Sequence, residues 1–231
     1  MLSWFEIIQS INTDPKKYLG YPSLQRLFSY LNGYWYAHPN CSRECLDGFN
    51  AYIAKQYNIN SSHNWPSIID FFSSDEKDAY NNFIFHFNNF TQNKNICDTP
   101  QIKSGTEQSV RPLLDIIIEV SYFPEIVLGN PSLERLEAFL RGCGHGEVNY
   151  DTHYIDGFNQ YIKDRYSIAT NKSWAEIISF FSYDDRGAYD NFINNFNDYL
   201  SQTAGSFARR ITKRSPGERG TILRQPWGER S

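Results

Sequence analysis

The chain has 231 residues, of which 40% are hydrophobic and 16% aromatic, and it carries a formal charge of −4. A chain of this size and composition can bury an apolar core in each of two halves. It contains no apolar run of about 18 residues, and its first ten residues lack the basic start and long apolar stretch of a signal peptide. The composition therefore argues against a membrane or exported protein and predicts a soluble, cytoplasmic one.

An internal repeat organises the chain. Residues 2–90 align without a gap with residues 111–199 at a constant offset of 109, and about 32 positions between residues 19–88 and their counterparts are identical. Fixed spacing indicates that packing sets the distances between elements. The sequence predicts one module at 1–90, a polar linker at 91–110, a second module at 111–200 and a basic, disordered tail at 201–231. A structural module that occurs twice in one chain is more typical of a binding scaffold than of an enzyme.

The first elements of each module are predicted from apolar residues at helical spacing. An opening helix covers residues 4–11 and 113–120. The next helix begins after Pro22 and Pro131, and Gly33 and Gly142 are placed as its stop signals. The third helix follows Asp47 and Asp156, which are suited to be N-caps.

Two further helices complete each module. One begins near Trp65 and Trp174, where Ser173 and Glu176 have the spacing of a capping box. The other begins at Ser73 and Ser182, and the aromatic stripes of all these helices are expected to form the core. Because no period-two β-branched run of useful length occurs, the predicted fold is all-α, with two tandem copies of a roughly five-helix module.

The two copies differ most at residues 34–46, which share only Asn40 with residues 143–155. We expect a loop here that joins two helices and carries residue types common in protein interfaces. The candidate partner-binding residues are Tyr34, Trp35 and Tyr36 in the first copy and Glu147, Tyr150, Asp151, His153 and Tyr154 in the second. Neutral drift in an exposed connection is the alternative explanation.

Charge is distributed unevenly along the chain. Residues 111–200 contain fourteen acidic and seven basic residues, a formal charge of −7, whereas residues 1–90 carry −2. An acidic body favours a basic protein partner and disfavours a nucleic-acid surface. The tail, with seven basic and two acidic residues, either contacts nucleic acid or is an extension that docks on the acidic body.

Patterns typical of catalysis are missing from the sequence. It has no Gly-rich phosphate loop, no nucleophile elbow and no carboxylate pair that helix capping leaves unexplained. A zinc interpretation of His38, Cys41 and Cys45 fails because the second copy lacks equivalent ligands. We therefore predict a protein that is not an enzyme and that needs no cofactor or metal.

Four stretches present in both copies carry a resemblance: LG-x-PSL-x-RL, FN-x-YI-x3-Y, W-x2-II-x-FFS and A-Y-x-NFI. They resemble helical immunity proteins of bacterial polymorphic toxin systems, including contact-dependent growth inhibition. The resemblance implies a cytoplasmic antidote that binds a cognate protein toxin, often a basic nuclease, and covers its active site or substrate surface. A nucleic-acid-associated adaptor that uses the tail and a structural helical scaffold remain alternatives.

Overall fold

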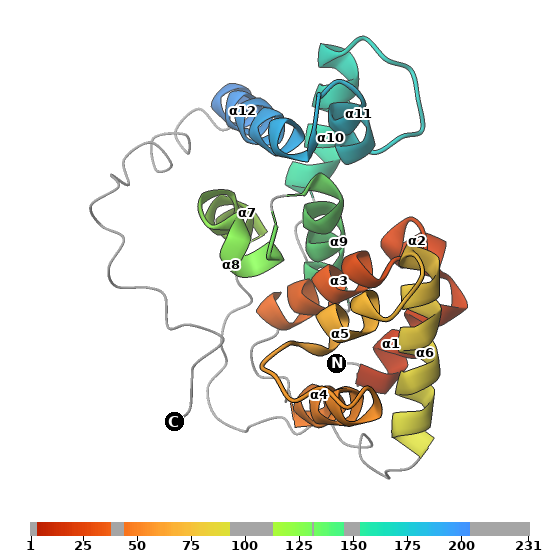
Figure 1. Ribbon diagram of the computed structural model, residues 1–231. Helices are drawn as coiled ribbons and strands as arrows, with labels where there is room; N and C mark the ends of the chain where they lie inside the picture. Colours follow the sequence, from red (N-terminus) through yellow and green to blue (C-terminus); the bar gives the residue numbers. More distant parts are fainter. Residues whose placement is uncertain (1–3, 38–43, 93–112, 131, 146–152, 204–231) are drawn as a thin grey trace, which may run out of the picture.

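The computed structural model describes residues 4–37, 44–92, 113–130, 132–145 and 153–203, and within these ranges the chain forms twelve α-helices and no strand (Figure 1). The first half, residues 4–92, contains α1 (Trp4–Thr13), α2 (Pro15–Leu19), α3 (Leu24–Ala37), α4 (Glu44–Gln56), α5 (Trp65–Phe71) and α6 (Glu76–Gln92). The second half, residues 113–203, contains α7 (Leu113–Tyr122), α8 (Pro124–Leu128), α9 (Leu133–Cys143), α10 (His153–Arg165), α11 (Trp174–Phe180) and α12 (Asp185–Thr203). The all-α prediction is confirmed for this part of the chain, and every helix of the second half begins 109 residues after its counterpart.

Each half has six helices instead of the five expected, because the five-residue helices α2 and α8 were not predicted. Both begin with proline, whose fixed φ suits a first helical position, and Asp14 caps α2 by accepting a hydrogen bond from the Lys17 amide at 3.1 Å. Both are followed by a glycine with positive φ, Gly20 at 83° and Gly129 at 75°. Helices of five residues are too short to show a hydrophobic periodicity from which they could be predicted.

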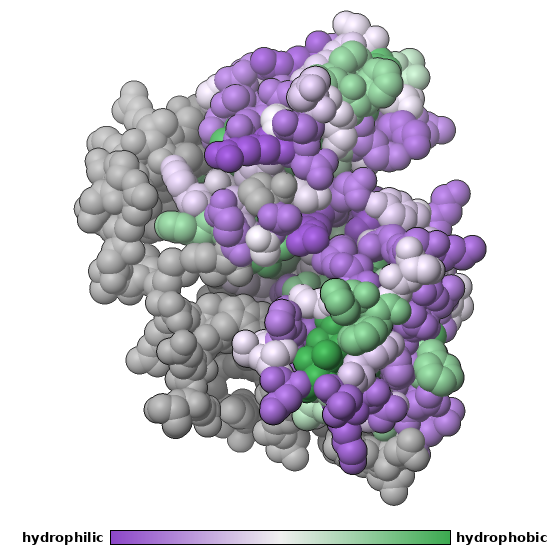
Figure 2. Space-filling view, viewed as in Figure 1, coloured by the Kyte–Doolittle hydropathy of each residue, from purple (hydrophilic) through white to green (hydrophobic). Residues whose placement is uncertain are grey.

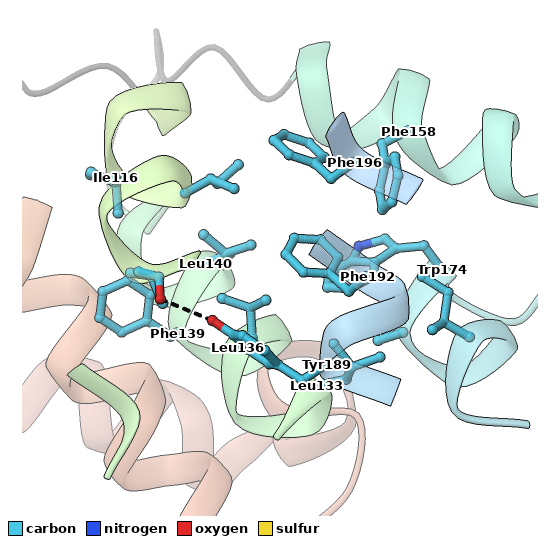
Figure 3. Packing of buried hydrophobic residues seen from close by; sticks show 14 of the residues in the cluster. Ile116, Leu133, Leu136, Phe139, Leu140, Phe158, Trp174, Tyr189, Phe192 and Phe196 are labelled. Atoms are coloured by element: carbon cyan, nitrogen blue, oxygen red, sulfur yellow. Dashed lines mark hydrogen bonds between the residues drawn. The ribbon is translucent and has the colours of Figure 1, made fainter. Parts of the chain in front are cut away.

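Apolar side chains gather into two clusters, each formed mainly by one half, and Figure 3 shows the one formed mainly by the second half. The predicted tryptophan anchors are buried and make the same contact in both clusters. Trp65 lies 4.9 Å from Phe83 between ring centroids, and Trp174 lies 4.9 Å from Phe192, each at an interplanar angle of 34°. Repetition of this geometry explains why the aromatic stripes are retained in both copies.

Helices α3 and α9 cross in the middle of the molecule and join the halves (Figure 1). The prediction that Gly33 and Gly142 stop these helices is wrong, because α3 continues to Ala37 and α9 to Cys143. A Cβ at Gly33 would clash with the carbonyl oxygen of Phe139, and one at Gly142 would clash with that of Tyr30. The two glycines are therefore needed for close approach of two backbones.

An ion pair is buried at the same crossing. The Arg26 guanidinium in α3 lies 3.0 Å from a Glu137 carboxylate oxygen in α9, and both side chains are more than nine-tenths buried. Arg141 donates a second hydrogen bond to the Glu137 carboxylate at 2.9 Å. Since an isolated charge is costly to bury, this pairing fixes the register of the two helices.

The predicted helix caps are confirmed for α11 and wrong for α4, α6, α10 and α12. Ser173 and Glu176 form the expected capping box at the start of α11. The α6 and α12 helices are instead capped by Asp75 and Asp184, which accept from backbone amides three residues ahead at 2.8 and 2.7 Å. Asp47 and Asp156 lie inside α4 and α10, which begin before these residues, at Glu44 and His153.

Candidate functional site

Two of the predicted partner-binding residues are core residues. Tyr34 and Trp35 were expected in an exposed loop, but they lie in the last turns of α3 with only 1% and 4% of their surface exposed. Trp35 packs on Trp4 with ring centroids 4.0 Å apart, and Tyr34 contacts the same ring edge-on at 6.1 Å. The prediction of a loop is wrong here, because α3 does not end at Gly33 but continues to Ala37, where it packs closely against α9.

The third of these residues contacts the other half of the molecule. Tyr36 is half-buried and packs against Phe139 of α9 with centroids 5.6 Å apart. Its counterpart, His145, contacts Tyr30 of α3 edge-on at 5.7 Å and accepts or donates a hydrogen bond at the Tyr30 hydroxyl. Part of the divergent segment therefore joins the two halves.

The structure does not describe the side chains of the remaining candidates. Glu147, Tyr150 and Asp151 lie outside the described residues, as do most of the linker and of the tail. His153 and Tyr154 form the first turn of α10, and their side chains are not described. His38 and Cys41 of the zinc interpretation also lie outside the described residues, and the side chain of Cys45 is not described.

Exposed aromatic residues mark a different surface. Phe71 at the end of α5 is 80% exposed, and Phe180 at the end of α11 is 77% exposed. Each lies edge-on against the next residue, Phe72 or Phe181, at 5.1 Å. A single exposed apolar side chain is ordinary on a protein surface, but here an exposed phenylalanine recurs at the equivalent position of both copies.

A third aromatic ring completes each of these groups. Tyr57 stacks on Phe72 with centroids 4.7 Å apart at 17°, and Tyr166 stacks on Phe181 at 4.6 Å and 16°. We call Tyr57, Phe71 and Phe72 the first aromatic cluster, and Tyr166, Phe180 and Phe181 the second aromatic cluster. The two clusters have the same residues in the same geometry, and in each the outermost ring faces solvent.

Contacts within the fold do not explain why both copies have a phenylalanine at the position of Phe71 and Phe180. Other polar and apolar identities between the copies have structural partners: Asn82 donates to the Ser73 hydroxyl at 2.9 Å, and Asn191 donates to the Ser182 hydroxyl at 2.8 Å. The Phe71 ring contacts only its neighbour Phe72 among the aromatic rings of the described chain. A phenylalanine that is kept in both copies without being buried is expected to contact something outside the fold.

The surroundings of the two clusters differ. In the first half, the Tyr57 hydroxyl lies 3.0 Å from Nε2 of His86, which in turn contacts the exposed ring of Phe85. The equivalent positions in the second half are asparagines, and there the fully exposed Tyr183 follows the cluster instead. The two clusters therefore share the same three central rings and differ in the residues around them.

Acidic residues accompany both clusters. Residues 70–78 contain four acidic residues and one basic residue, and residues 179–187 contain two acidic residues and one basic residue. Asp78 is close enough to Tyr57 to help raise the pKa of that phenol, although burial is the larger cause. An apolar centre beside negative charge is an arrangement that suits a basic protein surface.

No group of metal-ligating side chains is found in the described part of the chain. There, no group of three or more His, Cys, Asp or Glu side chains is placed to hold a metal ion. The tyrosine pKa shifts have a plain structural cause, since burial raises the pKa of Tyr80 to about 12. Among these residues no helix is long and apolar enough to cross a membrane.

Sequence reasoning missed the clusters because it treated the aromatic stripe as core. Phe72 and Phe181 continue the helical spacing of Trp65 and Trp174, but both are about half-exposed. Phe71 and Phe180 lie off the stripe formed by Trp65, Ile68 and Ile69 and their counterparts, yet are identical in both copies. The signal in the sequence that distinguishes these two residues is that they are identical in both copies although they lie away from the buried face of the helix.

Comparison with known proteins adds no family: no family model matches the sequence, and no curated protein and no solved structure is significantly similar to it.

Proposed function

We propose that this chain is a non-catalytic, cytoplasmic immunity protein that binds a cognate bacterial protein toxin and blocks its active site or substrate surface. The observation that carries the proposal is the pair of aromatic clusters, with Phe71 and Phe180 kept exposed at equivalent positions. A protein-binding function explains their retention, since aromatic rings supply much of the binding energy at protein interfaces.

The charge of the chain supports a basic toxin. Residues 111–200 carry fourteen acidic and seven basic residues, and both aromatic clusters lie beside acidic residues. Opposite charge accelerates encounter with a basic partner, and nuclease toxins of this kind are basic because they bind nucleic acid. The resemblance of the shared stretches to helical immunity proteins points the same way.

The proposal includes two tandem modules of six helices each. Supporting it are the constant offset of 109 between the helix starts and the separate apolar cluster of each half. In this arrangement α3 and α9 hold the modules together, and the clusters at the ends of α5 and α11 are left free for the toxin. Tyr34 and Trp35 then act in folding instead of binding.

Co-purification from the native host tests the proposal. The full chain is expressed with an affinity tag, and a toxin fragment is expected to be recovered at a constant molar ratio and identified by mass spectrometry. The identified toxin is then expressed alone, where it should arrest growth, and together with the chain, where growth should be restored.

Matched variants test whether the aromatic clusters make the contact. Phe71→Ala and Phe180→Ala together should abolish recovery and protection, whereas Tyr122→Ala, which removes a half-exposed ring outside the clusters, should retain both. Protection that survives the double variant would exclude the clusters as the contact surface. Recovery of nucleic acid without any toxin would contradict the immunity function itself.

A further inference from the structure

The halves of the molecule are related by reciprocal contacts. Gly33 of α3 approaches the carbonyl of Phe139, and Gly142 of α9 approaches the carbonyl of Tyr30. Residue 142 is the counterpart of residue 33, and residue 139 is the counterpart of residue 30. A contact in which each partner offers the same two positions to the other is the pattern of a two-fold dimer interface, here formed within one chain.

This relation makes the two aromatic clusters equivalent in space as well as in sequence. Because α5 packs on α3 and α11 packs on α9, the exchange of α3 with α9 also exchanges α5 with α11 and the exposed rings at their ends. Figure 2 shows apolar surface in two separate places on one face, over α5 and over α11, with hydrophilic surface between them. The clusters are therefore two surfaces of the same kind and not the ends of one apolar groove.

The residues around each aromatic cluster indicate which kind of ligand the cluster suits. Each cluster offers an edge-to-face pair of phenylalanines to an apolar side chain, and Asp70 and Asp75 in the first half or Asp184 and Asp185 in the second are exposed close by in the chain. Carboxylates at the edge of an apolar contact favour lysine or arginine beside the inserted group. The complement is a basic protein segment with one or more apolar anchor residues.

We propose that the chain is bivalent: each half binds one such basic segment, so that one molecule engages two, one at Tyr57, Phe71 and Phe72 and the other at Tyr166, Phe180 and Phe181. This inference deepens the proposed function, on which it rests, by giving the stoichiometry and the recognised chemistry. The two-fold relation supports this stoichiometry. Two equivalent clusters need two equivalent partner surfaces, and a single asymmetric partner domain presents each of its surfaces only once. Two toxin molecules, or the two subunits of a dimeric toxin, meet that requirement.

A selected peptide serves as the probe. A phage-displayed library of random 12-residue peptides is selected against the immobilised full chain, and the strongest binder is synthesised and titrated by isothermal calorimetry. We expect a peptide rich in Lys or Arg with an aromatic or large aliphatic residue, bound at two per chain. Phe71→Ala and Phe180→Ala should each reduce the stoichiometry to one, and the double variant should bind none.

Tyr122→Ala is the control and should bind two peptides, and circular dichroism checks that each variant keeps its helix content. A stoichiometry of one in the unchanged protein, binding that neither phenylalanine variant affects, or failure to select any peptide would overturn bivalent recognition. These results are independent of the toxin recovery experiment. A chain that neutralises a toxin at a one-to-one ratio would keep the proposed function and lose this inference.

Discussion

The two ends of the α3–α9 crossing differ although the helices are copies of each other. At one end Arg26 reaches Glu137 across the crossing, but its counterpart Arg135 donates to the backbone carbonyl of Leu128 in its own half at 3.1 Å. Phe28, which stands at the position equivalent to Glu137, packs on Trp65 of its own core. The close glycine contacts are symmetric, whereas the ion pair forms only once.

The crossing therefore has glycine contacts that are needed in both helices and an ion pair that is needed only once. Backbone approach is required on both sides, so both glycines are kept. The ion pair needs only one occurrence because the halves are covalently linked and always meet in the same order. The following predictions test that division, and the largest effect is expected at the symmetric feature.

Substitution of Gly33 or Gly142 by alanine should destabilise the protein by about 3 kcal/mol or more, because the added methyl meets backbone atoms that cannot turn aside. Urea unfolding followed by circular dichroism measures the loss. Gly144→Ala is the matched control, since a Cβ there has ordinary contact distances, and it should change stability little. Unequal losses for Gly33 and Gly142 would show that the crossing is not reciprocal.

Glu137→Gln should cost about 2–3 kcal/mol, because it removes the charge that balances the buried guanidinium of Arg26. Thermal unfolding gives the shift. Glu134→Gln changes a mostly exposed carboxylate at 4.0 Å from Arg26 and should cost less than about 1 kcal/mol. If the two variants lose equal stability, the buried pair does not set the register of the helices.

Phe72→Ala and Phe181→Ala should each cost about 1 kcal/mol through loss of the stacked tyrosine contact. Phe71→Ala and Phe180→Ala should cost less than about 0.5 kcal/mol, because these rings are mostly in solvent. Chemical unfolding of the four variants compares them directly. A large loss for Phe71→Ala would mean that the ring supports the fold, and its retention in both copies would then need no partner.

His86 should make stability depend on pH in the first half. Burial lowers the pKa of this imidazole, and its Nδ1 is buried without a hydrogen-bond partner among the described residues. The folded state therefore takes up a proton less readily than the unfolded chain, whose histidines titrate near 6.5, and stability should fall as pH drops through that value.

Asparagine occupies the position equivalent to His86 in the second half, so His86→Asn gives a natural replacement. The variant should lose less stability than the unchanged protein between pH 7 and pH 5, in urea titrations at each pH. Because the imidazole is only partly buried, we expect a small difference. Identical pH profiles would show that His86 does not carry the acid sensitivity.

Local signals in the sequence predicted most helices correctly. The stripes after Pro22 and Pro131 and the tryptophan helices lie where expected, and the Ser173–Glu176 box is confirmed. Signals that work within one turn of chain, such as caps and periodicity, are readable because their partners are three or four residues away. Where two caps compete, as Ser73 and Asp75 do, the pattern alone does not decide.

The site was harder to find from sequence because interface residues and core residues are of the same types. Tyr34 and Trp35 are residue types common in interface hot spots, yet they are buried against Trp4, about thirty residues earlier in the chain. Phe71 looks like one more core phenylalanine until its place off the buried stripe is compared with that of Phe180. Composition does not tell which face of a helix is covered by another element.

The sequence by itself determined that this protein is helical and that the same helices occur twice, because helix formation and capping depend on neighbours along the chain. Only the tertiary structure decided what Gly33, Tyr36 and Phe71 do. Gly33 and Tyr36 contact the other half of the molecule across more than a hundred residues of sequence, and Phe71 contacts little of the fold at all. These roles follow from which surfaces meet in space, and local propensity carries no information about that choice.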